Sequence, residues 1–298
     1  MRKLLYRTLA LSYGAYFNST ALFSEKEAGK RAFKTFTTPR KGRILPVQQE
    51  YLQEYLGKKI LVNNTGLQTY EWPGAGETVL LMHGWESNAF RWRYLIEKLQ
   101  EREFNIIAFD APGHGYSEGN RLNVVTYANS ARQLIDLYRP KHIIGHSMGG
   151  LATLHNQYQN PNTSIEKIVT LGAPAELSEL MAHYQNLVRF NNKVLEALDK
   201  HVYEHFNYRV HDISTPKFAK SIAQKGLIIH DEWDTITPFN ASERLHQNWK
   251  NSSLIKTTGL GHSLHQEEIN LQIVDFYHLK FLVHFMPKPI SFLKYAYF

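Results

Sequence analysis

The most specific chemical signal in the chain is a Gly-x-Ser-x-Gly pattern centred on Ser147. A short apolar run precedes it and a helical pattern follows it, which predicts a strand, a sharp turn and a helix. In such a turn the serine hydroxyl projects above the edge of the sheet, and Gly145 and Gly149 leave room where a Cβ would meet neighbouring backbone. The pattern therefore predicts a serine nucleophile. A tight turn with an inert serine is the competing interpretation.

A serine hydroxyl becomes a strong nucleophile only when a base removes its proton, and the usual base is a histidine oriented by an acid. Two later segments, each directly after a predicted strand, supply such residues. His262 follows a glycine-rich turn and is the predicted base, with His265 as the alternative. Asp234 is the predicted acid, and Asp231 is the alternative that would more often serve a turn or cap. Both segments should lie at the carboxyl edge of the sheet, beside the serine.

Acyl transfer also needs backbone N–H groups that stabilise an oxyanion. The amide of Met148 lies at the predicted helix N-terminus, and the amide of Trp85 lies in the loop after an early strand, so these two are the predicted oxyanion hole. The side chains of Trp85, His146 and Trp233 are predicted to contact the substrate. Plain packing is the alternative role for Trp85, and bracing of a loop is the alternative for His146.

Apolar runs alternate with helical patterns around these residues, and this rhythm predicts a mostly parallel sheet flanked by helices. A hairpin opens the sheet, with strands at Lys59–Asn63 and Leu67–Trp72. The later strands are predicted at Thr78–Met82, Asn105–Phe109, His142–Ile144, Lys167–Leu171, Gly226–His230 and Ser253–Thr257. Helices are predicted at Asn88–Gln100, Val124–Tyr138 and Gln266–Tyr277.

The strand rhythm is interrupted once, between residues 175 and 225, where several helical patterns occur without a strand. We interpret this segment as a helical cap inserted into a core formed by residues 59–174 and 226–278. Residues 1–58 are a basic, amphipathic, helical extension, and residues 279–298 are an aromatic and basic tail. A surface excursion with no role at the site is the alternative for the inserted segment.

The formal net charge of +7 is concentrated at the N-terminus, because the first 43 residues hold ten Lys or Arg and only two Glu. The remaining chain is close to neutral, so a basic field directed at nucleic acid is not predicted. Cysteine is absent, which excludes disulfides, thiolate metal sites and a cysteine nucleophile. No run of 18 uncharged apolar residues indicates a transmembrane helix.

Apolar residues recur at helical spacing in residues 1–37, as in Leu5, Leu9, Tyr13 and Phe17. We expect this arm to pack its apolar face on the domain. One alternative is an arm that lies on an anionic membrane surface. The other is a secretory signal, although Arg7 interrupts the apolar region that such a signal needs. The C-terminal tail could dock on the body, or both ends could form a membrane or dimer patch. A cytoplasmic location is expected, with a peripheral position at the membrane surface as the alternative, and the oligomeric state is not predicted.

Taken together, the motifs resemble those of the α/β-hydrolase superfamily, in its serine esterase- and lipase-like branch, over about residues 59–278. The matching segments are His83-Gly84-Trp85, residues 110–117, residues 145–150, residues 234–238 and Gly261-His262. The resemblance implies an eight-stranded sheet, a Ser147–His262–Asp234 triad, and no metal or organic cofactor. The dehalogenase branch is disfavoured because its nucleophile is aspartate. The two ends of the chain match no part of the common pattern.

The predicted function is therefore a serine hydrolase that cleaves a carboxylic ester with a small to medium apolar acyl group. A thioesterase, acyltransferase or amidase using the same triad is the alternative within enzymes. A binding protein that keeps the fold without turnover is the alternative outside them. The expected partner is a small-molecule ester, and substrate identity cannot be deduced from the sequence.

Overall fold

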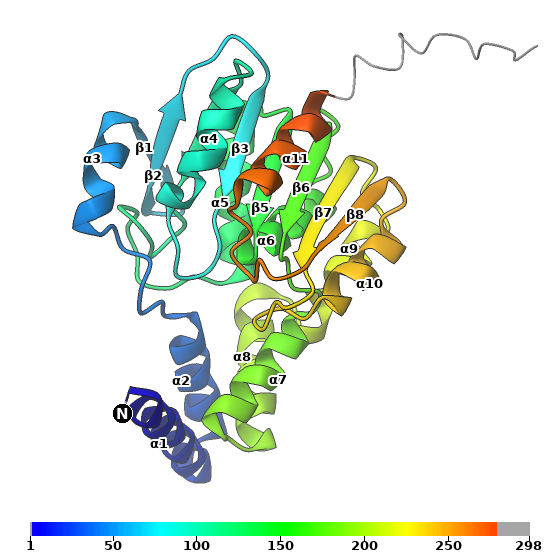
Figure 1. The fold of residues 1–298 in the computed structure, drawn as a ribbon. Helices are drawn as coiled ribbons and strands as arrows, with labels where there is room; N and C mark the ends of the chain where they lie inside the picture. The colour runs from blue at the N-terminus through cyan, green and yellow to red at the C-terminus, as the bar shows by residue number, and fades with distance from the viewer. Residues whose placement is uncertain (1, 279–298) are drawn as a thin grey trace, which may run out of the picture.

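The computed structural model describes residues 2–278, so the predictions for residues 279–298 lie outside the described residues. Within that range eight strands form one sheet in the order β1-β2-β4-β3-β5-β6-β7-β8 (Figure 1). β1 pairs antiparallel with β2 and β2 with β4, while all other neighbours pair parallel. The strands are β1 (Leu56–Val62), β2 (Thr65–Trp72), β3 (Thr78–Met82), β4 (Asn105–Phe109), β5 (His142–His146), β6 (Lys167–Leu171), β7 (Lys225–Asp231) and β8 (Ser252–Thr257). The predicted mostly parallel sheet is confirmed.

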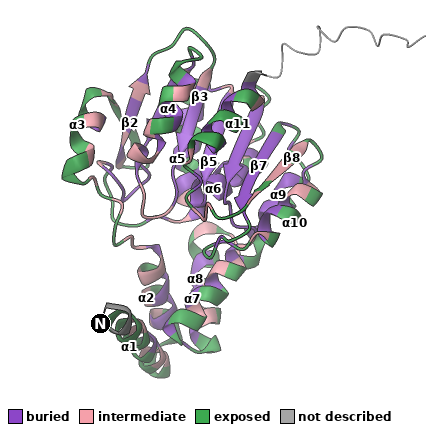
Figure 2. Cartoon of the chain, viewed as in Figure 1, coloured by how far each residue is buried: buried purple, intermediate pink, exposed green. Residues whose placement is uncertain are grey.

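Helices cover both faces of this sheet because the central strands are apolar on both sides. Leu80 and Met82 of β3 belong to a core shared with α5 (Val124–Tyr138) and α6 (Met148–Gln159). Val79 and Leu81 point the other way, into a core shared with α4 (Arg93–Gln100) and α11 (Glu267–His278). Figure 2 shows the resulting buried layer running through the middle of the body. The predicted helix at residues 88–100 begins instead as a 3₁₀ turn, η1 (Ala89–Trp92).

The inserted segment leaves and re-enters the body at one place. Its two ends pair through Leu177 N–H to Ile213 O at 3.0 Å and Thr215 N–H to Ala175 O at 2.8 Å. Between these ends, α7 (Leu177–Val188) and α8 (Asn192–Phe206) project beyond the carboxyl edge of the sheet (Figure 1). The short elements η2 (Val210–Asp212) and α9 (Thr215–Ala219) follow, and α9 packs on α6 and on α10 (Asn240–Asn248).

The N-terminal arm consists of α1 (Arg2–Phe23) and α2 (Glu25–Thr37), and it packs on α7 and α8 rather than on the sheet (Figures 1 and 2). Only part of the expected apolar face of α1 is covered. Phe17 is fully buried, whereas Leu5 is 69% and Leu9 is 45% exposed. The arm therefore meets the inserted helices around Gly14 and Phe17 of α1, and apolar side chains toward both ends of the helix stay exposed.

A third helix, α3 (Pro46–Glu54), follows the arm and was not predicted. Its single fully buried residue, Leu52, packs into the core beneath α4 and α11. Among the described residues, no helix has the length and apolar content needed to cross a membrane.

Candidate active site

Ser147 occupies a strained turn between β5 and α6, with φ 51° and ψ −120°. A side chain rarely tolerates this conformation, so the surrounding structure must hold it. The Ser147 N–H donates to Leu171 O at 2.8 Å. A Cβ on Gly149 would lie 2.2 Å from Met82 O, which explains why this position needs glycine. The turn at Ser147 therefore has the strained strand-to-helix geometry that the sequence pattern predicts.

The structure brings His262 and Asp234 together at the carboxyl ends of β7 and β8. His262 Nδ1 lies 2.6 Å from Asp234 Oδ2, and the Asp234 side chain is fully buried. The other oxygen, Oδ1, accepts the N–H groups of Ile236 and Thr237 at 2.8 and 3.0 Å. The carboxylate is thus fixed by its own loop and directed at one ring nitrogen, which leaves Nε2 of His262 for another proton.

A second histidine also holds this carboxylate, and sequence reasoning gave it no role. His230 is completely buried, with Nε2 3.2 Å from Asp234 Oδ2 and 2.8 Å from Thr237 O. Burial by itself would raise the pKa of Asp234. The hydrogen bonds from His230, His262 and the Thr237 amide outweigh burial and hold the pKa of Asp234 far below its ordinary value. Asp234 is therefore an anion at any pH near neutrality.

The alternative acid, Asp231, serves its own loop. Its carboxylate accepts the N–H groups of Trp233 and Leu260 at 3.0 and 2.9 Å and the hydroxyl of Thr257 at 2.8 Å. These bonds tie the end of β7 to the loop that carries His262. The structure thus gives Asp231 the turn and cap contacts that were considered for it.

The loop after β3 lies directly over the serine. A Cβ on Gly84 would be 3.0 Å from the Cβ of Ser147, so only glycine allows this approach. Trp85 and Met148 both line the same cavity as Ser147. Met148 is the first residue of α6, where an N–H has no acceptor within the helix. Met148 thus follows the serine directly in the chain, and Trp85 follows the glycine that approaches the serine.

Arg91 and His146 brace the loop that carries His262. An Arg91 Nη1 lies 2.8 Å from His146 Nδ1, and Nη2 donates to Ser263 O at 2.7 Å. His146 Nε2 lies 2.9 Å from His262 O. Burial first, then the charge of Arg91, lowers the pKa of His146 well below its ordinary value, so its ring is neutral. Neutral His146 accepts from Arg91 and donates to His262 O.

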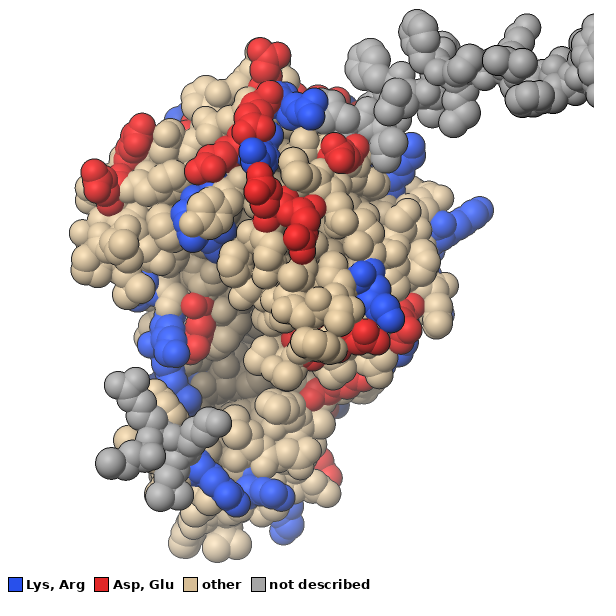
Figure 3. Space-filling model, viewed as in Figure 1, with Lys and Arg blue, Asp and Glu red and all other residues tan. Residues whose placement is uncertain are grey.

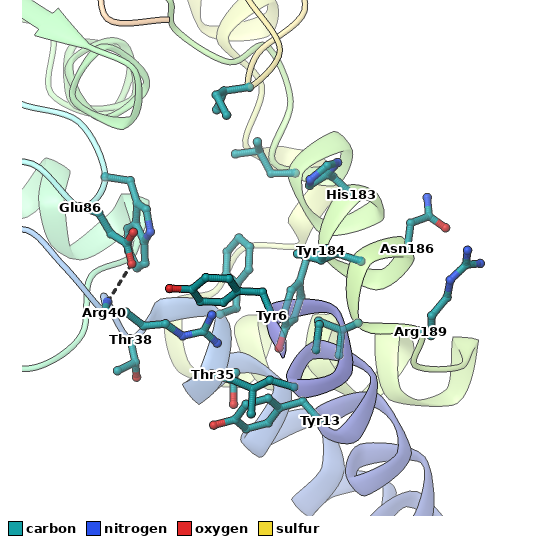
Figure 4. Close-up of a pocket in the computed structure, with 18 of the residues that line it drawn as sticks. Tyr6, Tyr13, Thr35, Thr38, Arg40, Glu86, His183, Tyr184, Asn186 and Arg189 are labelled. Carbon is teal, nitrogen blue, oxygen red and sulfur yellow. Dashed lines mark hydrogen bonds between the residues drawn. The ribbon is translucent and has the colours of Figure 1, made fainter. Parts of the chain in front are cut away.

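A cavity of about 830 Å³ opens above Ser147, between the body and the helices of the arm and the inserted segment. Figure 3 shows the surface hollowed in this region, and Figure 4 shows lining side chains converging from α1, α2, α7 and the loop of Glu86. Trp85 lines the cavity as expected. His146 and Trp233 are not among the lining residues, so their contact with a substrate stays a prediction. The two His146 nitrogens are bonded to Arg91 and to His262 O, as in the loop-bracing role considered for this residue, and Trp233 is 66% exposed.

Within residues 2–278, no group of three or more His, Asp or Glu side chains is arranged to hold a metal ion. The groups that the site offers for chemistry are a serine hydroxyl, an imidazole bonded to a buried carboxylate, and backbone amides at the start of α6 and in the loop after β3.

Comparison with known proteins agrees with this geometry. Residues 77–218 match the family described as the α/β hydrolase fold. An uncharacterized hydrolase of Bacillus subtilis, YugF, is 26% identical over 260 residues, which cover 72% of this chain and 94% of the relative. A pimeloyl-[acyl-carrier protein] methyl ester esterase of Vibrio vulnificus is 29% identical over 139 residues, covering 46% of this chain and 51% of that enzyme.

Solved structures share the fold at lower identity. A putative lipase from Acinetobacter baumannii superposes with a TM-score of 0.60 at 18% identity, covering 79% of this chain and 96% of the lipase. An esterase from Exiguobacterium antarcticum gives 0.57 at 19% identity, covering 75% and 98%. With its sheet order, its strained serine turn and these matches, the chain has the α/β-hydrolase fold and is similar to members of that superfamily.

Proposed function

We propose that the protein is a serine hydrolase that cleaves a carboxylic ester through an acyl-enzyme, with Ser147 as nucleophile, His262 as base and Asp234 as the orienting acid. The observation that carries the proposal is the 2.6 Å contact between His262 Nδ1 and Asp234 Oδ2, at the same edge of the sheet as the strained turn that holds Ser147 at φ 51°. This contact commits Nδ1 to the carboxylate, so Nε2 is the ring atom that exchanges protons with substrate and serine.

The proposed cycle has two halves. Ser147 Oγ attacks the ester carbonyl while His262 takes its proton, and the amides of Trp85 and Met148 stabilise the oxyanion. The carbon–oxygen bond to the alcohol then breaks, and His262 returns the proton to the leaving alkoxide. Water, deprotonated by the same histidine, attacks the acyl-enzyme. The acyl bond to Ser147 Oγ then breaks, His262 returns the proton to Oγ, and the acid is released. Asp234 stabilises the imidazolium in both halves without taking a proton itself.

Esters are favoured over other acyl compounds by the relatives, several of which are named esterases. A thioesterase, acyltransferase or amidase remains the alternative with the same residues. The proposal includes α7 and α8 as a cap over the serine, because both helices project from the carboxyl edge and α7 lines the cavity. A binding protein without turnover is the second alternative, and an activity assay separates it.

Hydrolysis of p-nitrophenyl esters from acetate to palmitate by the wild type and by Ser147→Ala tests the proposal. We expect the wild type to hydrolyse at least one ester and the variant to retain no more than background. Equal rates for the two proteins would contradict the assignment of the nucleophile. An inactive wild type that cleaves acyl thioesters or anilides would move the proposal to those substrates.

A further inference from the structure

We propose that the N-terminal arm, α1 and α2, forms the far wall of the acyl-binding cavity, and that the substrate carries a medium-length to long apolar acyl chain. This inference rests on the proposed function, since it takes Ser147 as the reacting end of the cavity. It adds a specificity-determining segment that lies outside the matched family region, residues 77–218. It also shifts the expected acyl group toward longer chains than the sequence suggested.

The arm is closely fitted to the inserted helices. A Cβ on Gly14 of α1 would lie 1.9 Å from Val188 O at the end of α7. A Cβ on Gly29 of α2 would lie 2.4 Å from the backbone of Ala197 in α8. Helix backbones approach this closely only where glycine removes the side chain. The two glycines therefore set the position of the arm at two separate points.

Hydrogen bonds between remote parts of the chain hold the same position. The side chain of Asn18 donates to Arg189 O at 3.2 Å and accepts the Asn191 N–H at 2.8 Å. The hydroxyl of Tyr184 donates to Ala32 O at 3.2 Å. The arm and the α7–α8 pair are thus one packed unit, and side chains on the inner side of α1 have defined places.

Those inner side chains complete the cavity. The cavity is lined by Ser147 and Met148 and also by α1, which contributes Tyr6, Leu9, Ala10, Leu11 and Tyr13. Figure 4 shows Tyr6 and Tyr13 of α1 in this lining, together with residues of α2 and α7. Tyr6 is 61% and Leu9 is 45% exposed, and both line this open cavity. Uncovered apolar side chains facing a cavity favour an apolar ligand, since binding removes their surface from water. An apolar ligand would therefore cover exposed side chains of the N-terminal half of α1, such as Tyr6 and Leu9.

The size of the cavity indicates the length of the chain. At about 830 Å³ it lies near the upper end of the range for small-molecule sites, about 300–1,000 Å³. A short acyl group attached to Ser147 would leave most of this space, and the whole α1 wall, without contact. An apolar chain extending from Ser147 to α1 would contact it.

Two matched substitutions on α1 test the wall. Ala10 lines the cavity, whereas Ala15 is exposed and does not, so Ala10→Trp fills the far end and Ala15→Trp is the control. The assay is kcat/KM on p-nitrophenyl esters from acetate to palmitate, with Ser147→Ala as background. Because each buried methylene is worth about 0.8 kcal/mol, each one that Ala10→Trp excludes should lower kcat/KM about fourfold. We expect a loss of about tenfold or more on the longest productive esters and less than about twofold on acetate.

The outcomes separate the wall from the chemistry. The proposal that α1 lines the acyl site would be contradicted if folded Ala10→Trp kept the acyl-chain-length preference of the wild type. An equal loss of kcat/KM in both tryptophan variants would also contradict it. Absence of ester hydrolysis in the wild type would overturn the proposed function instead. Calorimetric binding of decanoate provides a readout that needs no turnover. We expect Ala10→Trp to weaken decanoate binding about tenfold and Ala15→Trp to leave it unchanged. Equal decanoate affinity in the wild type and both variants would refute the proposal that α1 lines the acyl site.

Discussion

Replacing Asp234 by asparagine tests the role of the carboxylate with almost no change in shape. The oxygen that accepts the Ile236 and Thr237 amides is retained in the asparagine, so the loop keeps these bonds. The group facing His262 Nδ1, now 2.6 Å from a carboxylate oxygen, becomes an NH₂ donor. His262 must then present a lone pair at Nδ1 and carry its proton at Nε2, the position that has to receive the serine proton.

The expected magnitude follows from this tautomer change. In a serine protease the corresponding substitution lowers kcat about 10⁴-fold, and the same inversion of the imidazole is expected here. The loss should appear in kcat with KM for p-nitrophenyl esters little changed, because the cavity is untouched. The assay is steady-state hydrolysis at pH 7–8 by the wild type and Asp234→Asn, with folding checked by circular dichroism.

Asp231→Asn is the matched comparison, since Asp231 is three residues away and bonds only its own loop and the neighbouring one. This variant should be less stable than the wild type, and its kcat should fall less than about tenfold. Stability against pH gives a second readout. The folded-state pKa of Asp234 is depressed, so its contribution is present near neutrality and is lost as the pH falls below about 4. Asp234→Asn should therefore flatten the fall of Tm below that pH. Equal kcat losses in both variants would refute the assignment of Asp234.

Two further predictions concern buried groups. Arg91→Met should lower kcat roughly 10- to 100-fold with KM unchanged, because Arg91 and His146 position the His262 loop. Arg91→Lys should restore part of the rate. A lower Tm with normal kcat would show that Arg91 has a purely structural role. Burial lowers the pKa of His155 to about 4, and both its ring nitrogens lack partners among the described residues. The unfolded state therefore binds protons first as the pH falls below 6.5, so His155→Phe should gain stability over the wild type between pH 6.5 and 4, by up to about 3 kcal/mol in urea unfolding. A constant difference across that range would contradict this assignment.

The interior of the sheet could be predicted closely from the sequence. β3, β4 and β6 have the predicted bounds because each is a continuous apolar run that is buried on both faces. β1 begins three residues earlier than predicted, since this edge strand is largely exposed and its lysines give a weak pattern. α3 was missed for a similar reason, as it buries only one residue completely.

The elements of the site that follow strand ends were predictable, and those made by tertiary contacts were not. Ser147 directly follows β5, and Asp234 and His262 lie in the loops that follow β7 and β8, where the sheet brings them to one edge. Arg91 and His146 are 55 residues apart in the chain, and the sequence around neither residue indicates that their side chains meet. In α1 the periodicity identified an apolar face, but it could not show that the inserted helices cover Phe17 while Leu9 faces a cavity.

The most direct test of the central claim is covalent trapping of the nucleophile. A fluorophosphonate reacts with a serine only when a neighbouring base activates it, so labelling reports the arrangement of Ser147 and His262 without requiring the right ester. Intact-protein mass spectrometry followed by peptide mapping should show one adduct on Ser147 in the wild type. No adduct should form in Ser147→Ala, and labelling should be slow in His262→Ala. Labelling at another residue, or no labelling of the folded wild type, would contradict the account.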